Sequence, residues 1–148
     1  MARADYILPV LLGAAYVVAV RILVSVTLTW GDPVSSDDFW GQSNATAVAY
    51  MQIYHSIGVV LAALPISLAI AWRYKVDWLR PAGIAAVVAT LYMLFDQIRG
   101  AWLISQHGVA PATYQVVSGA IDVVKVGLIL LLLTALLRCI VLLRRKLQ

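Results

Sequence analysis

Two pairs of oppositely charged residues stand inside long apolar runs of this sequence. Asp96 and Arg99 lie in "AAVVATLYMLFDQIRGAWLI", and Asp122 and Lys125 lie in "SGAIDVVKVGLILLLL". Each pair is spaced i,i+3, which places both side chains on one face of a helix. A carboxylate beside a cation in an apolar segment can form an internal ion pair, or it can hold a proton or a small charged ligand.

Two further ionisable side chains lie in apolar surroundings. Arg21 occurs in "VVAVRILVSV", and His55 occurs eight residues before Ala63 in the second long apolar run. An imidazole can change its protonation near neutral pH, so His55 is a candidate ligand or switch as well as an ordinary hydrogen-bonding residue. The candidate site therefore consists of six residues, which are Arg21, His55, Asp96, Arg99, Asp122 and Lys125.

The segments that carry these residues are typical of membrane spans. The chain has 148 residues, 63% of them hydrophobic and 12% charged, with a mean hydropathy of +0.91. Such values exclude an ordinary soluble domain, and runs of about 20 apolar residues cross a bilayer. We predict an all-α, antiparallel four-helix bundle in one transmembrane domain over residues 1–148, with spans at about 6–30, 45–72, 82–104 and 113–143.

The basic residues predict the orientation of these spans. The link between the second and third spans contains Arg73, Lys75 and Arg80, and further cations lie near both termini. The other two links contain no Lys or Arg. By the positive-inside rule, both termini and the middle link face the cytoplasm. We expect an integral protein of a bacterial cytoplasmic (inner) membrane, with a basic net charge explained by lipid headgroups and no nucleic-acid partner.

Counting along the spans places the ionisable residues at one depth. Arg21, His55, Asp96 and Asp122 each lie eight to ten residues from the predicted outer end of their span. At 1.5 Å per residue this is roughly 12 to 14 Å below that end. Arg99 and Lys125 lie within one turn of the two aspartates. We therefore predict a charged layer in the outer half of the bundle, with one more cation than carboxylates.

Three interpretations of this layer are open. It can be an internal ion-pair network that fixes helix register, as buried polar residues do in some proteins. It can be a pocket for a small anion, a lipid headgroup or a proton. It can also be a surface that meets charges on another membrane subunit, or on a second copy in a homo-oligomer.

Other kinds of chemistry have little support in the sequence. Cys139 is the single cysteine, His55 and His107 are the two histidines, and no Glu is present. A disulfide within the chain is impossible, and no grouped metal ligands or phosphate-binding glycine loop occur. We expect no cofactor, no metal and no catalytic residue.

The favoured function is an accessory or assembly subunit of a larger membrane complex. A small transporter or ligand-binding bundle is the alternative, and an enzyme is the least favoured class.

Overall fold

A computed structural model describes residues 4–30, 44–108 and 113–146 of the chain. These residues form four helices, which are α1 (Ala4–Trp30), α3 (Asn44–Arg73), α4 (Leu79–Gln106) and α5 (Thr113–Lys146), and the described part contains no strand. Each helix contains a segment long and apolar enough to cross a bilayer, at Tyr6–Thr29, Ala49–Arg73, Leu79–Gln106 and Val116–Leu143. The chain is an integral membrane protein with a four-helix bundle, as the sequence predicts.

The helix limits agree with the predicted spans to within three residues, and α4 extends beyond its predicted span at both ends. This helix begins at Leu79, three residues before the predicted start. Pro81 then falls in the first turn, where its missing N–H costs no helical hydrogen bond. The link between α3 and α4 is correspondingly short, covering residues 74–78.

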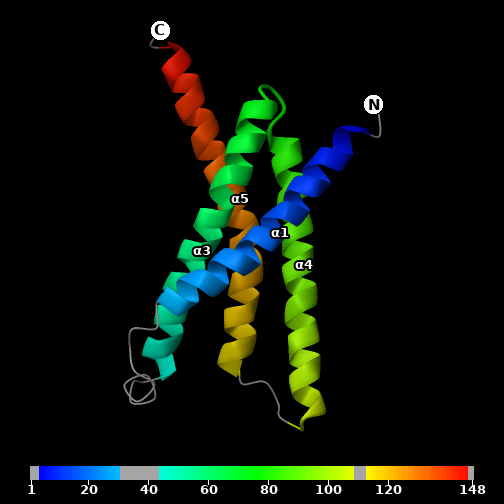
Figure 1. Cartoon of the computed structure of the whole chain (residues 1–148), viewed down its shortest axis with the longest axis vertical. Coiled ribbons are helices and arrows are strands. Elements are labelled where there is room, and N and C mark those ends of the chain that lie inside the picture. Colours follow the sequence, from blue (N-terminus) through cyan, green and yellow to red (C-terminus); the bar gives the residue numbers. More distant parts are fainter. Residues whose placement is uncertain (1–3, 31–43, 109–112, 147–148) are drawn as a thin grey trace.

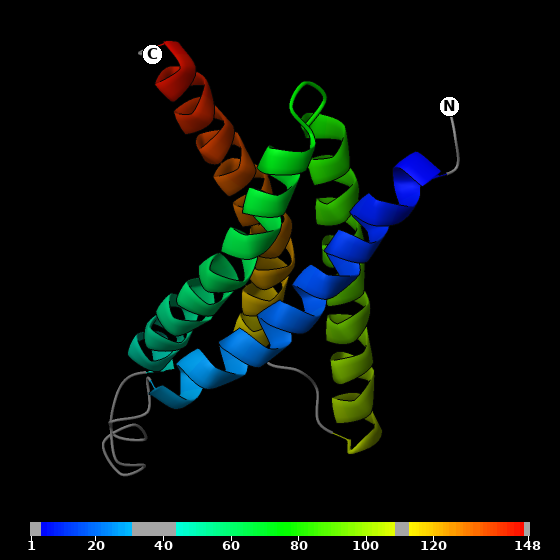
Figure 2. The same cartoon turned by 45° about the horizontal axis from the view of Figure 1, so that its top comes forward.

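The four helices form a ring in which each helix packs against two others. α1 packs against α3 and α4, and α5 packs against the same two helices from the other side (Figure 1). The N-terminal half of α1 crosses α4, and the rest of α1 then runs away from α4 toward α3, as both views show (Figure 2). Arg21, in the second half of α1, still reaches Asp96 on α4 through its long side chain.

The core is built from small and branched side chains. Its buried members are Tyr16, Val17, Val20, Val59, Ala62, Ala63, Ile70, Ala82, Ala85, Ala86, Ala89, Met93, Val123, Val126 and Leu130. Tyr16 is fully buried and donates a hydrogen bond from its hydroxyl to the carbonyl of Val126, 2.9 Å away, which joins α1 to α5 through the middle of the bundle. Because lipid is as apolar as this core, close packing rather than the hydrophobic effect holds such helices together.

Two glycines permit the closest approach of α1 to its neighbours. A Cβ added at Gly58 would lie 2.7 Å from Val24 Cα, and one added at Gly13 would lie 2.9 Å from the carbonyl oxygen of Ala85. In both cases the obstructing atom is backbone, which cannot move aside. Gly58 therefore sets the distance between α3 and α1, and Gly13 sets the distance between α1 and α4.

The C-terminal end of α3 is capped by an arginine from α5. Arg138 is 5% exposed and donates from its guanidinium to the carbonyl oxygens of Ala71, at 3.1 Å, and of Lys75. The last carbonyls of a helix have no partner within the helix, and a cation is favourable at this negative end of the dipole. Arg138 thus fastens the middle link of the chain to α5.

Candidate functional site

The structure divides the six candidate residues between two interfaces of the ring. His55, Asp122 and Lys125 meet between α3 and α5, whereas Arg21, Asp96 and Arg99 meet between α1 and α4. Within the described residues, no ion pair joins one group to the other. All six residues lie in the same half of the bundle along their helices, but they form two separate groups rather than one site.

The first group is centred on Asp122 and Lys125. Lys125 Nζ lies 2.8 Å from Asp122 Oδ1, and the two side chains are only 14% and 13% exposed. This contact is an ion pair by distance, although its angles are not those of a hydrogen bond. Lys125 Nζ also donates a hydrogen bond to Gln52 Oε1 at 2.6 Å, so the ammonium group contacts both helices.

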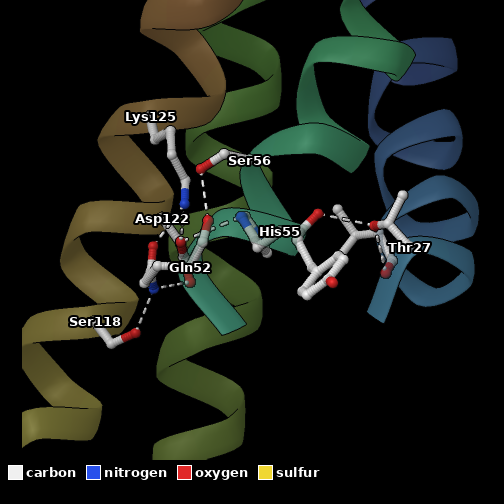
Figure 3. A network of polar contacts seen from close by, with 9 residues as sticks. Thr27, Gln52, His55, Ser56, Ser118, Asp122 and Lys125 are labelled. Carbon is white, nitrogen blue, oxygen red and sulfur yellow. Dashed lines mark hydrogen bonds and ion pairs between the residues drawn. The ribbon is translucent and has the colours of Figure 1, made fainter. Parts of the chain in front are cut away.

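Gln52 connects the charged pair to α3. Its Nε2 donates to Ser118 Oγ at 2.6 Å and lies 3.4 Å from Asp122 Oδ2 (Figure 3). One amide therefore accepts from the cation and donates toward the carboxylate and a hydroxyl. We call Gln52, His55, Ser118, Asp122 and Lys125 the α3/α5 cluster.

His55 lies on the other side of the same carboxylate. Its Nδ1 is 3.3 Å from Asp122 Oδ1, and its side chain is 13% exposed. The two atoms are buried and are not aligned as a hydrogen bond. With a neutral imidazole, the α3/α5 cluster holds one cation and one carboxylate and is formally uncharged. An uncharged, mostly buried cluster can hold two helices in register, and its imidazole can accept one further proton.

The second group consists of Arg21 on α1 and Asp96 and Arg99 on α4. Arg21 Nη2 lies 2.5 Å from Asp96 Oδ1, and Arg99 Nη2 lies 3.3 Å from the same oxygen. The Arg21 guanidinium also lies over the ring of Tyr92, 5.2 Å from its centre, in a cation–π arrangement. We call Arg21, Tyr92, Asp96 and Arg99 the α1/α4 cluster.

This second cluster lies at the surface of the bundle. The side chains of Arg21, Asp96 and Arg99 are 46%, 31% and 58% exposed, against 13 to 14% for the charged side chains of the α3/α5 cluster. At 1.5 Å per residue, Arg21 and Asp96 lie roughly 5 Å from the midpoints of their candidate spans, and Arg99 lies roughly 10 Å away. These charges therefore face outward at a depth that belongs to the hydrocarbon of a bilayer.

Two residues of the α3/α5 cluster, Gln52 and Ser118, are not among the candidates that the sequence predicts. The same is true of Arg138, which caps the end of α3 outside both clusters. Gln52 stands three residues before His55, so helical spacing was a usable signal for its face. The partner of Arg138 lies 67 residues away in the sequence, at Ala71, and no local pattern indicates it.

Comparisons with protein families, with curated proteins and with solved structures find no match for this chain. Within the described residues, no group of three or more His, Cys, Asp or Glu side chains is arranged to hold a metal ion. We therefore base the functional proposal on the two clusters.

Proposed function

We propose that this chain is an accessory or assembly subunit that binds another membrane-embedded protein through the outward side of α1 and α4. The observation that carries the proposal is the exposure of Arg21, Asp96 and Arg99 on that side, inside two candidate membrane spans. Charged side chains within spans almost always face the bundle interior or a water-filled cavity. An outward-facing group is therefore expected to be covered by something other than hydrocarbon.

The energetic cost of exposing Arg21, Asp96 and Arg99 to lipid supports this proposal. A charge at the centre of a membrane helix costs about 2.5 to 3.5 kcal/mol on insertion scales. The ion pairs with Asp96 offset this cost in part, but the group still holds two guanidiniums and one carboxylate. Contact with a second protein would remove these groups from lipid and supply further hydrogen bonds.

Crosslinking in native membranes tests the proposal. A photoreactive amino acid at Ile22, which is 58% exposed beside Arg21, is expected to give a protein adduct in the host membrane. In the matched control, the photoreactive amino acid replaces Leu132 on α5, which is 60% exposed, and it is expected to label lipid. Lipid adducts alone at both positions would contradict the proposal.

A small transporter or ligand-binding bundle is the second candidate, and the α3/α5 cluster is the feature that favours it. His55 Nδ1 is buried without a hydrogen-bond partner beside Asp122, so the cluster could accept a proton or a polar ligand. Against this candidate, the surface depression on α5 that includes Lys125 is otherwise lined by apolar side chains, namely Val117, Ala120, Ile121, Val124, Leu128 and Ile129.

An anion-release measurement tests this second candidate. If it is correct, chloride-loaded vesicles that contain the purified chain should release chloride faster than vesicles that contain the Lys125→Met variant. Equal rates of chloride release from the two kinds of vesicle would contradict anion transport through the α3/α5 cluster.

A further inference from the structure

We propose that the partner of the α1/α4 cluster is a transmembrane helix that carries a carboxylate at the depth of Arg21 and Arg99. This inference rests on the proposed function and names the chemistry of the partner. Its first basis is charge. Arg21 and Arg99 both contact Oδ1 of Asp96, so two guanidiniums share one carboxylate and the cluster has a formal charge of +1. A single carboxylate from outside would neutralise it.

Helix direction argues against lipid phosphate as the source of this negative charge. Side chains on a helix lean toward its N-terminus. Arg21 and Arg99 both lie in the C-terminal halves of their helices, so both lean toward the middle of the membrane. The contact between Arg99 and Asp96, one turn closer to the helix midpoint, agrees with this direction. The guanidiniums therefore point away from the nearer headgroup layer.

The same charge count argues against a second copy of this chain. A two-fold symmetric contact places the same patch on both sides of the interface. It would bring together two clusters, each with two arginines and one aspartate, and would double the excess charge. Like charges facing each other in low dielectric are costly, so a self-complementary dimer through this face is disfavoured.

The surroundings of the cluster fit a helix as the occupant. Val18 on α1, three residues before Arg21, and Phe95 on α4, four residues before Arg99, are each about 60% exposed and share a helix face with these arginines. They offer apolar contact area beside the two guanidinium groups. A partner helix can pack on these side chains and at the same time present one carboxylate to Arg21 and Arg99.

A designed single-span peptide tests the inference directly. The peptide is a leucine–alanine helix with Asp at one central position, and matched peptides carry Asn or Leu there. The full chain is placed in phosphatidylcholine vesicles at pH 8, and association is measured by fluorescence energy transfer. We expect the Asp peptide to bind about tenfold more tightly than the Asn peptide, a difference of about 1.4 kcal/mol, because both can donate or accept hydrogen bonds but only Asp neutralises the excess charge of the cluster.

Variants assign the preference to the cluster. Arg99→Gln should abolish the preference for Asp, and Arg99→Asp should instead favour a peptide that carries Lys. Lys75→Gln, which removes an exposed cation at the opposite end of the bundle, should leave the preference unchanged. Helix content by circular dichroism confirms that each variant is folded, and the reversed preference of Arg99→Asp keeps the test valid if Arg99→Gln is unstable.

The peptide-binding and crosslinking results together distinguish a carboxylate-bearing helix from the other possible occupants. Equal binding of the Asp, Asn and Leu peptides overturns the inference. An Asp preference that disappears in vesicles containing phosphatidylglycerol overturns it in favour of a lipid phosphate. A protein adduct at Ile22 without any Asp preference would retain the proposed function and reject this partner chemistry. An Asp preference without an adduct in native membranes would reject the proposed function and, with it, a native partner of the cluster.

Discussion

Individual residues in the α3/α5 cluster have roles that differ with their partners. Asp122 contacts Lys125 on its own helix and His55 on α3, while Gln52 contacts Lys125, Ser118 and Asp122. The carboxylate supplies the only negative charge near Lys125 among the described ion pairs. Its removal would leave an ammonium group in low dielectric with a neutral amide as its main partner.

Replacement of Asp122 by Ala should therefore be more harmful than replacement of an exposed aspartate. We expect Asp122→Ala to lower the free energy of unfolding by about 3 to 5 kcal/mol, the cost of stranding a buried charge. Asp77→Ala, in the exposed link between α3 and α4, should change it by less than about 0.5 kcal/mol. Unfolding in mixed detergent micelles, followed by circular dichroism, measures both.

The double variant Asp122→Ala with Lys125→Met checks the cause. Removal of both charges takes away the stranded ammonium group, so the double variant should be more stable than Asp122→Ala alone. If the single and double variants are equally unstable, Asp122 acts through its hydrogen bonds or its volume rather than through its charge.

At the scale of helices, the spacing between α1 and α3 depends on Gly58. A methyl group at this position would meet the backbone of Val24 at 2.7 to 2.8 Å, so the two helices would have to separate. The Thr27 hydroxyl lies 2.9 Å from the carbonyl oxygen of Tyr54, one turn away, and this contact would lengthen with them (Figure 3).

Two glycine substitutions should consequently have opposite effects. Gly58→Ala is expected to destabilise the bundle by about 1 to 3 kcal/mol, as overpacking of a closed interface does. Gly83→Ala on α4 meets no atom within 4 Å and should stabilise its helix by up to about 1 kcal/mol, because alanine is the better helix former. Thermal unfolding in detergent distinguishes them, and a neutral Gly58→Ala would show that α1 and α3 can move apart without cost.

At the scale of the whole molecule, orientation in the membrane remains a prediction, and so does the location in a bacterial cytoplasmic membrane. The outer face is expected at the end of the bundle where α4 terminates, because the links at this end lack Lys and Arg. The charged clusters lie in the half of the bundle nearer to this end.

Cysteine labelling in intact cells tests the orientation. Cys139 is exposed and must first be replaced by serine. Gln106→Cys in that background should react with an impermeant thiol reagent added outside, and Lys75→Cys should not, since the two exposed positions lie at opposite ends of α4. Labelling of Lys75→Cys alone would reverse the topology and place both clusters in the cytoplasmic half.

The sequence alone determined the four spans and the two pairs spaced i,i+3. Span length and apolar composition are local properties, and helix geometry brings Asp96 to Arg99 and Asp122 to Lys125 without help from other helices. The limits of all four helices could be predicted within three residues for the same reason.

Only the tertiary structure decided which helices face one another. The spans are apolar on all sides, so their sequences do not mark the inward face as an amphipathic helix does. Rotation of each helix depends instead on distant contacts, such as Gly58 against Val24. These contacts place Arg21 beside Asp96 and His55 beside Asp122, and they leave one cluster mostly buried and the other exposed at the surface.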